Sequence, residues 1–480
     1  MKDLEDLRRS RRCLAILALA LVAYWPTLRV GFLWDDHVMI ESNPALREWS
    51  GRALTHDFTT DVFDGHGDPY YRPAQTLLNR MDYSIWGLRP FGYHLTNWLG
   101  HAANALLLQE LVIALGFGNL VALLVGCLFA VNPMPVEQLI IIAGRAEIFG
   151  LTFTLISLLF LLREDAESWA LGYAAYALAL LFKESALITP FLLAILYLYR
   201  KVPRSAYWRL LPHGVLAIPY LMLRYHAVGP LISHATIGYI SKFFFEAYAQ
   251  VLLIYARLIL MPWNLHSHRM MPNLTHFWPL LDMFFVGLAI YLIRRKSRWG
   301  LLGFAWFVIM LLPKTPIMIY GNFMLDHWAY PASFGIILPL AVVYAKLWQG
   351  RKNPFSYWTG MTFFPLVIFW ALLVHLNVAL RGTDEKMYRW ALHFTQSHPI
   401  QFNLGALLVE QGRPMEAIPY FENVRADYPK DVNNIYALAQ AYWQTGHPKI
   451  AIRLLEGIQM ICPPARQTLF MMKASRRSKP

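Results

Sequence analysis

Two adjacent carboxylates follow the first long apolar stretch of the chain. Asp35 and Asp36 stand in the run Phe-Leu-Trp-Asp-Asp-His at 32–37. The end of a membrane helix is a rigid platform for catalytic groups, and a carboxylate there can accept the proton of an acceptor hydroxyl as a general base. Helix capping or loop solvation is the competing interpretation. We therefore predict Asp35 and Asp36 as candidate catalytic residues.

Two cations further along the chain are candidates for binding an anionic lipid headgroup. Arg145 lies in a Gly-Arg-Ala-Glu run and Lys183 separates two apolar stretches, so we expect both near the outer interface. A guanidinium offers a phosphate a planar fork of donors, and an ammonium offers it a point charge. Acidic neighbours provide the alternative of structural ion pairs: Glu137 or Glu147 for Arg145, and Glu184 for Lys183.

A polar stripe runs along the apolar stretch at 94–115. His94, Asn97, His101 and Asn104 fall within an arc of ~80° on one helix face. Such side chains in a membrane helix must face protein or water rather than lipid. The stripe therefore indicates either a functional site or hydrogen bonding between helices. We expect no metal site, because the two histidines are seven residues apart and no zinc-binding motif accompanies them.

The remaining candidates are polar residues that we expect in outer loops. Tyr71 and Arg72 belong to a Tyr-Tyr-Arg-Pro run, and Asp326 and His327 begin an Asp-His-Trp-Ala-Tyr-Pro run. An interfacial aromatic belt is the alternative for the second run. We predict that these residues bind substrate or shape the site, together with His94, Asn97, His101, Glu137, Glu147 and Glu184.

The composition indicates which elements must hold these residues. Of 480 residues, 57% are hydrophobic and 15% charged, and the mean hydropathy is +0.36, whereas soluble domains are nearer a quarter charged. This excludes a disordered chain, a secreted disulfide scaffold and an ordinary cytosolic enzyme. The net charge of +13 comes from short basic runs between apolar segments, a pattern typical of membrane orientation rather than nucleic-acid binding.

We predict an all-α, polytopic membrane protein with about eleven transmembrane helices. The expected spans are 13–31, 94–115, 119–131, 147–162, 168–182, 185–199, 208–225, 277–293, 299–313, 333–348 and 357–378. The basic runs at 8–12, 200–204, 294–298 and 351–352 should be cytoplasmic. The first outer loop, 32–93, and the C-terminal segment are then on the opposite side.

One apolar segment, 240–262, does not fit this count. As a full crossing it would invert every later basic loop, so we interpret it as an interfacial or re-entrant helix on the outer side. An additional span, with a compensating error elsewhere in the count, is the alternative.

The last hundred residues repeat with a period of 34. Six positions recur at that offset: Leu404, Gly412, Ala417, Ile418, Phe421 and Pro429 return as Leu438, Gly446, Ala451, Ile452, Leu455 and Pro463. This period and these residue types are typical of tetratricopeptide repeats. We predict a membrane domain at 1–380 and a repeat domain at 381–480. A helical cap on the last span is the alternative.

Taken in order, the motifs resemble those of GT-C superfamily glycosyltransferases that carry tetratricopeptide repeats. The motifs are Asp-Asp, Tyr-Arg-Pro, His-x-x-Asn-x-x-x-His, Asn-Pro-x-x-x-Glu, Gly-Arg-x-Glu and Lys-Glu. Similar families are the transmembrane O-mannosyltransferases and, more distantly, the protein O-mannosyltransferases. This chain has Asn132-Pro133 where the family often has His-Pro, and His327 where animal relatives often have arginine.

The resemblance implies transfer of a sugar, such as mannose, from a polyprenyl- or dolichyl-phosphate to a hydroxyl of an acceptor protein or glycan. It implies Asp35 as the base, with Asp36 beside it, and Arg145 and Lys183 on the donor phosphate. The reaction should invert the anomeric carbon on the non-cytoplasmic face. The residues require no cofactor, although a divalent cation is compatible with the family.

The resemblance favours the bacterial inner membrane, or the endoplasmic reticulum membrane in a eukaryote. The repeats are suited to a protein partner. Two other functions stay open: a non-enzymatic repeat scaffold for membrane assembly, and a transporter of lipid-linked saccharides, for which repeated halves would be expected.

Overall fold

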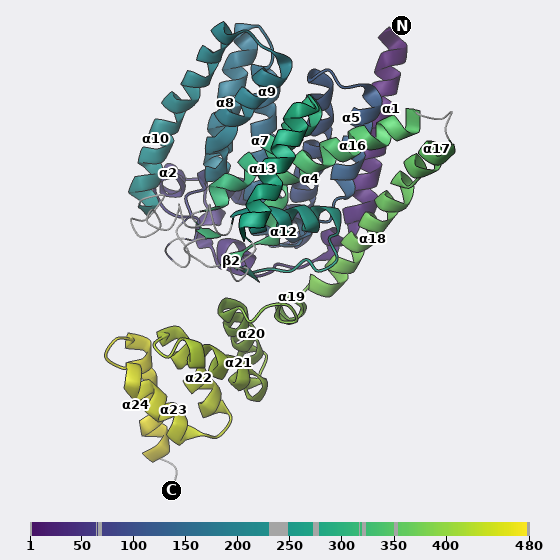
Figure 1. Cartoon of the computed structure of the whole chain (residues 1–480). Helices are drawn as coiled ribbons and strands as arrows, with labels where there is room; N and C mark the ends of the chain where they lie inside the picture. Colours follow the sequence, from purple (N-terminus) through teal and green to yellow (C-terminus); the bar gives the residue numbers. More distant parts are fainter. Residues whose placement is uncertain are drawn as a thin grey trace. The chain divides into compact units, whose positions relative to one another are not determined.

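The computed structural model describes residues 2–63, 65, 70–229, 248–271, 278–315, 317–318, 323–349 and 354–477. The chain divides into two units. The first comprises residues 1–265 and 271–382, and the second comprises 266–270 and 383–480. Both are built from helices (Figure 1).

The first unit contains the apolar helices. They are α1 (Lys2–Tyr24), α2 (Gly51–Thr59), α3 (Pro73–Trp86), α4 (Pro90–Ala114), α5 (Asn119–Val131), α6 (Val136–Ile140), α7 (Arg145–Leu161), α8 (Ala166–Phe182), α9 (Thr189–Arg200), α10 (Leu211–Val228), α12 (Tyr248–Leu260), α13 (Trp278–Arg294), α14 (Arg298–Leu311), α16 (Phe334–Gln349), α17 (Pro354–Met361) and α18 (Phe363–Arg381). Short 3₁₀ or π turns join them: η1 (Trp25–Arg29), η2 (His37–Glu41), η3 (Pro44–Arg47), η4 (Ile142–Gly144), η5 (Glu184–Ile188), η6 (Arg204–Leu210), η7 (Leu312–Lys314), η8 (Asp326–Ala329) and η9 (Pro331–Ser333). A two-residue strand, β2 (Phe323–Met324), lies before η8.

Helix ends follow the local sequence. Pro90 starts α4, where its missing N–H costs nothing. The Asp165 side chain accepts a 2.8 Å hydrogen bond from the Ser168 backbone nitrogen and caps α8. Gly116, with φ of +85°, turns the chain between α4 and α5.

A helix occupies each of the expected spans, but the helices differ in length and apolarity. Within the described residues, four stretches are long and apolar enough to cross a membrane: Arg9–Arg29, Ile142–Leu161, Asp326–Gln349 and Phe363–Arg381. Shorter apolar helices are Asn119–Val131, Ala166–Phe182 and Tyr248–Leu260. The helical class is confirmed, and the count of eleven crossings stays a prediction. Of the segment 240–262, residues 240–247 lie outside the described residues, and 248–260 form α12.

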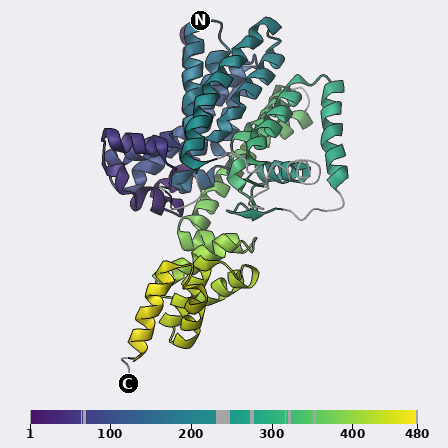
Figure 2. The same ribbon diagram turned by 90° about the vertical axis from the view of Figure 1, so that its left-hand side faces the viewer.

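Helices α7, α8 and α4 make up the centre of the first unit. Helix α7 packs against both α8 and α4, and α4 packs against α5 (Figures 1 and 2). Helices α14 and α16 cross at two glycines, where a Cβ on Gly303 would lie 2.4 Å from the Gly335 carbonyl oxygen. Only glycine permits so close a backbone contact.

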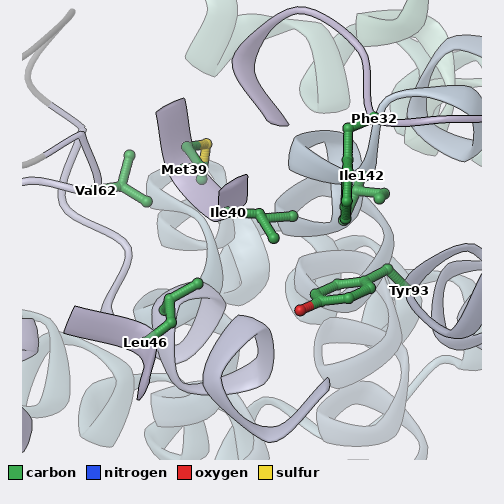
Figure 3. Packing of buried hydrophobic residues seen from close by; sticks show 7 residues of the cluster. All are labelled: Phe32, Met39, Ile40, Leu46, Val62, Tyr93 and Ile142. Atoms are coloured by element: carbon green, nitrogen blue, oxygen red, sulfur yellow. The ribbon is translucent and has the colours of Figure 1, made fainter. Parts of the chain in front are cut away.

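The segment that follows α1, residues 32–63, has a hydrophobic core of its own. Phe32, Met39, Ile40, Leu46 and Val62 gather around two residues from other elements, Tyr93 at the start of α4 and Ile142 in η4 (Figure 3). This packing fixes the loop that carries Asp35 and Asp36 against the segment before α7.

The second unit consists of helix pairs at a constant spacing. Its elements are β1 (Arg269–Met270), α19 (Asp384–Leu392), α20 (His398–Glu410), α21 (Pro414–Asp427), α22 (Val432–Gln444), α23 (Pro448–Ile458) and α24 (Pro463–Arg477). The start of α22 lies 34 residues after that of α20, and the same holds for α23 and α21. Gly412 and Gly446 end the first helix of each pair with φ of +75° and +79°.

Candidate functional site

Asp36 joins the segment that follows α1 to the turn before α7. Its carboxylate accepts backbone hydrogen bonds from Leu33 (3.0 Å), Ile142 (3.0 Å) and Ala143 (2.8 Å). The side chain is fully buried. Burial raises the pKa of Asp36 to about 7, while the three N–H donors favour the ionised carboxylate and lower it. The three bonds give Asp36 a structural role.

Asp35 is placed differently from its neighbour, because it is only partly buried. The residue before it, Trp34, has φ of +50°, a left-handed conformation that is strained for a bulky side chain. Strained backbone of this kind concentrates at functional sites. The strain at Trp34 and the clamp at Asp36 together fix the position of Asp35.

Arg145 is completely buried and surrounded by partners. Its guanidinium donates to Asn97 Oδ1 (3.0 Å), Asn79 Oδ1 (2.8 Å) and the Tyr93 carbonyl (3.1 Å). It also lies 2.7 Å from Asp82 Oδ2. Arg145 therefore joins α7 to α3 and α4. Its partner in the structure is Asp82, which sequence analysis did not identify, rather than Glu137 or Glu147.

The polar stripe of α4 binds backbone carbonyls. His94 contacts the carbonyls of Leu139 (2.8 Å) and Gly31 (3.2 Å), and His101 contacts that of Ala130 (3.2 Å). Asn97 donates to Gln138 at 3.1 Å and to Ile142 at 3.3 Å. Asn104 donates to Ile148 at 2.9 Å. Residues 132–142 are buried, and buried backbone carbonyls need such hydrogen-bond partners. His94 and Asn97 thus support this segment, whereas His101 and Asn104 bind carbonyls of α5 and α7.

A cluster of charges surrounds Glu147 in the first turn of α7. The Lys183 ammonium lies 2.7 Å from Glu147 Oε2. The Lys314 ammonium, at the end of η7, lies 2.9 Å from Oε2 and 3.1 Å from Oε1. Arg72 lies 3.6 Å from Glu184 and stacks over the Tyr70 ring at 4.3 Å. We call Arg72, Glu147, Lys183, Glu184 and Lys314 the Glu147 cluster.

A mostly apolar cavity begins at this cluster. It is small, with a volume of about 20 Å³, which is enough for a water molecule. Its lining residues are Glu147, Gly150, Leu151, Thr154, Ser185, Ala186, Ile188, Met310 and Pro331. Glu147 is the member of the cluster that lines this cavity, and most of the other lining residues are apolar.

Glu137 belongs to a separate cluster. Its carboxylate lies 2.8 Å from His327 Nδ1 and 3.3 Å from Arg381 Nη1. The Gln138 side chain donates to the His327 carbonyl at 2.8 Å. Asp326 is buried beside His327. Arg381, the last residue of α18, is a buried partner that sequence analysis did not identify.

Tyr71 has a different environment from Arg72. It is buried, donates to the Phe58 carbonyl at 3.1 Å and packs against Tyr220. Tyr71 therefore ties α2 to the start of α3.

The predicted residues thus fall into three neighbouring groups along the entry to α7. Asp36 binds Ile142 and Ala143, Arg145 begins the helix, and Glu147 follows one half-turn later. The second group is the Glu147 cluster, in which Lys183 pairs with Glu147 and Arg72 lies beside Glu184. The third group is Glu137 with His327. Lys314 was missed because its Leu-Pro-Lys context has no motif. In the described part of the chain, no three His, Cys, Asp or Glu side chains form a metal-binding group.

Comparison with known proteins gives one family model and several relatives. The model for the tetratricopeptide repeat matches residues 408–466. A protein O-mannosyl-transferase of Caenorhabditis elegans is 24% identical over 430 residues, which are 85% of this chain and 61% of the relative. The proteins named TMTC2 of Xenopus laevis and Homo sapiens are each 36% identical over 146 and 148 residues, 30% of this chain and 17% of theirs.

The relatives of this chain are named protein O-mannosyl-transferases. The similarity to protein O-mannosyl-transferases confirms the resemblance seen in the motifs, and the matched model confirms the tetratricopeptide repeats. The chain spans less than two thirds of the length of these relatives. No solved structure matches the chain.

Proposed function

We propose that this chain is a GT-C-type membrane glycosyltransferase that moves a sugar from a polyprenyl- or dolichyl-phosphate to a hydroxyl of an acceptor protein. The main support is the Glu147 cluster, in which the buried ammonium groups of Lys183 and Lys314 share the carboxylate of Glu147. The names of the relatives favour mannose as the sugar. The phosphate of the lipid donor binds the cations of this cluster.

Asp35 acts as the base in this proposal. Its carboxylate takes the proton of the acceptor hydroxyl while the hydroxyl oxygen attacks the anomeric carbon. The bond from that carbon to the phosphate oxygen breaks, and its electron pair leaves with the lipid phosphate. Because the attack comes from the face opposite the phosphate, the anomeric carbon is inverted. Asp36 and the strained Trp34 position the base.

The cations stabilise the charge that gathers on the leaving phosphate. Lys183, Lys314 and Arg72 serve this purpose, because they belong to the cluster that borders the cavity. Arg145 pairs with Asp82, so in this proposal it holds the start of α7 against α3 instead of binding the phosphate. Glu137, His327 and Arg381 hold the buried segment 132–142 in place.

The membrane arrangement follows from the basic runs. About eleven crossings, with the N-terminus inside, bring the first outer loop and the repeat unit to the non-cytoplasmic side. The repeats then recruit the acceptor protein on the side where transfer occurs. The bacterial inner membrane is the favoured location.

The decisive experiment is a transfer assay with the purified chain. It uses radiolabelled polyprenyl-phosphate mannose and a mixture of acceptor peptides that contain serine and threonine. Labelled peptide made by the wild type, with loss of product in Asp35→Asn, supports the enzyme. A scaffold or a transporter would bind protein or lipid and leave every peptide unlabelled.

A further inference from the structure

The Glu147 cluster holds more positive than negative charge. Arg72, Lys183 and Lys314 contribute three formal positive charges, against two negative charges from Glu147 and Glu184. Lys183 lies within electrostatic range of the other four groups. Glu147 and Lys314 are at most 3% exposed, and the side chains of Arg72 and Glu184 at most 16%. An unbalanced buried charge is unfavourable, so the cluster is suited to one more anion.

The Glu147 carboxylate occupies the position where such an anion would bind. Its Oε2 atom lies 2.7 Å from the Lys183 ammonium and 2.9 Å from the Lys314 ammonium. The same side chain lines the apolar cavity. A phosphate that binds the two ammonium groups therefore competes with this carboxylate.

We propose that Glu147 is a displaceable internal counter-ion, which neutralises Lys183 and Lys314 in the empty protein and yields them to a prenyl phosphate. This inference rests on the proposed function, since it takes the lipid phosphate as the anion. Transfer converts the phosphodiester of the donor into a phosphomonoester that carries one more ionisable oxygen. The product would bind the lysines more tightly than the donor does, and the returning carboxylate favours its release.

The test is ligand-dependent thermal unfolding of the full chain, with the wild type compared with Glu147→Gln. The probes are farnesyl phosphate, inorganic phosphate and farnesol. Without a probe, Glu147→Gln melts at a lower temperature, because two buried ammonium groups lose their carboxylate. Farnesyl phosphate raises the melting temperature more in the variant than in the wild type. Its affinity for the variant is on the order of tenfold higher, equivalent to ~1.4 kcal/mol.

The other two probes identify the group that is recognised. Farnesol should not raise the melting temperature of Glu147→Gln more than that of the wild type, because it has no charge. A rise with inorganic phosphate alone assigns the site to the phosphate group, and a rise that needs farnesyl phosphate assigns it to the lipid. Farnesol acting as strongly as farnesyl phosphate would overturn the counter-ion role.

Glu137→Gln is the matched control, because it removes a buried carboxylate that contacts His327 and Arg381 in the separate cluster. This variant should melt at a lower temperature than the wild type, and farnesyl phosphate should raise its melting temperature no more than it raises that of the wild type. Equal ligand-induced rises in the wild type and Glu147→Gln would overturn the inference. If Glu147→Gln does not fold, Lys314→Met gives the answer, since it leaves the Glu147–Lys183 pair and makes the cluster formally neutral. It should fold and lose most of the farnesyl phosphate response, and an unchanged response would again overturn the inference.

Failure of the inference is distinct from failure of the proposed function. If the wild type transfers sugar, but farnesyl phosphate raises the melting temperature equally in the wild type and Glu147→Gln, only the counter-ion role is refuted. If the wild type transfers no sugar, the proposed enzymatic function is refuted, whatever the melting curves show.

Discussion

The Asp36 carboxylate lies 3.0 Å from the backbone nitrogen of Ile142, a residue 106 positions further along the chain. With the bond to Ala143, this contact fixes the segment that follows α1 against the entry to α7. Asp35, its neighbour, has a partly exposed side chain. Two adjacent carboxylates therefore have separate roles, one in structure and one in the proposed chemistry.

Replacement of the two carboxylates should separate these roles. Asp35→Asn should lower transfer by roughly 10²–10⁴-fold, since it removes the general base, with little change in melting temperature. Asp36→Asn should cost about 1–3 kcal/mol of stability, because an amide cannot serve all three backbone donors as a carboxylate does. Transfer assays and thermal unfolding of both variants test this. Equal stability of the two variants would contradict the division of roles.

Substitution of Arg145 distinguishes a structural residue from a phosphate ligand. Arg145→Leu should cost ~3–5 kcal/mol of stability, because Asp82 is left buried without its cation. The combined Arg145→Leu and Asp82→Leu variant should regain part of that loss. Thermal unfolding measures both. A phosphate ligand would instead show a raised KM for the donor with unchanged stability, and that result would support the phosphate-binding role predicted for Arg145.

The contact between α14 and α16 depends on two glycines. Gly303→Ala or Gly335→Ala should cost about 1–3 kcal/mol, because the new Cβ meets a backbone oxygen that cannot move aside. Gly287→Ala in α13 is the matched control, since nothing lies within 4 Å of a Cβ there. That variant should be neutral or slightly more stable. Thermal unfolding of the three variants gives the comparison, and equal effects would refute the close contact.

The repeat unit depends on glycine in a different way. Gly412→Ala and Gly446→Ala should each cost about 1–2 kcal/mol, because a Cβ is strained at their positive φ even though space is open. Gly457→Ala, inside α23, has open space and no positive φ, so it should stabilise its helix. Hydrogen exchange of α20–α23 in the full chain reports these differences. Loss of protection in Gly457→Ala alone would contradict them.

The repeat unit should also lose stability in acid. Hydrogen bonds from Arg389 and Arg413 lower the pKa of Glu385 below its usual value, despite a small opposing effect of burial. A lowered pKa in the folded state gives stability that is present above the unfolded pKa of about 4.3 and is lost as the pH falls through the folded pKa. Hydrogen exchange of α19 between pH 6 and pH 3 should show this decline. Glu385→Gln should flatten it, and a parallel decline in both proteins would exclude this carboxylate.

Local patterns in the sequence were sufficient for the helices and the repeats. Apolar runs predicted the helical ranges, since a span must satisfy its own backbone within one continuous segment. The 34-residue offset predicted that Gly412 and Gly446 are equivalent, and both have the same positive φ. The motifs around Asp35, Arg145 and Lys183 indicated the family, because short motifs in a fixed order are visible without any fold.

The tertiary structure alone decided which groups meet. Lys314 contacts Glu147 across 167 residues, and Arg381 contacts Glu137 across 244. Arg145 binds Asp82 rather than the acids closer to it in sequence. Periodicity reports the face of one helix and is silent on which helix packs against it. Charge pairing between distant segments depends on that packing, so the sequence determined the parts of this protein and the fold determined which charges are neutralised by which partners.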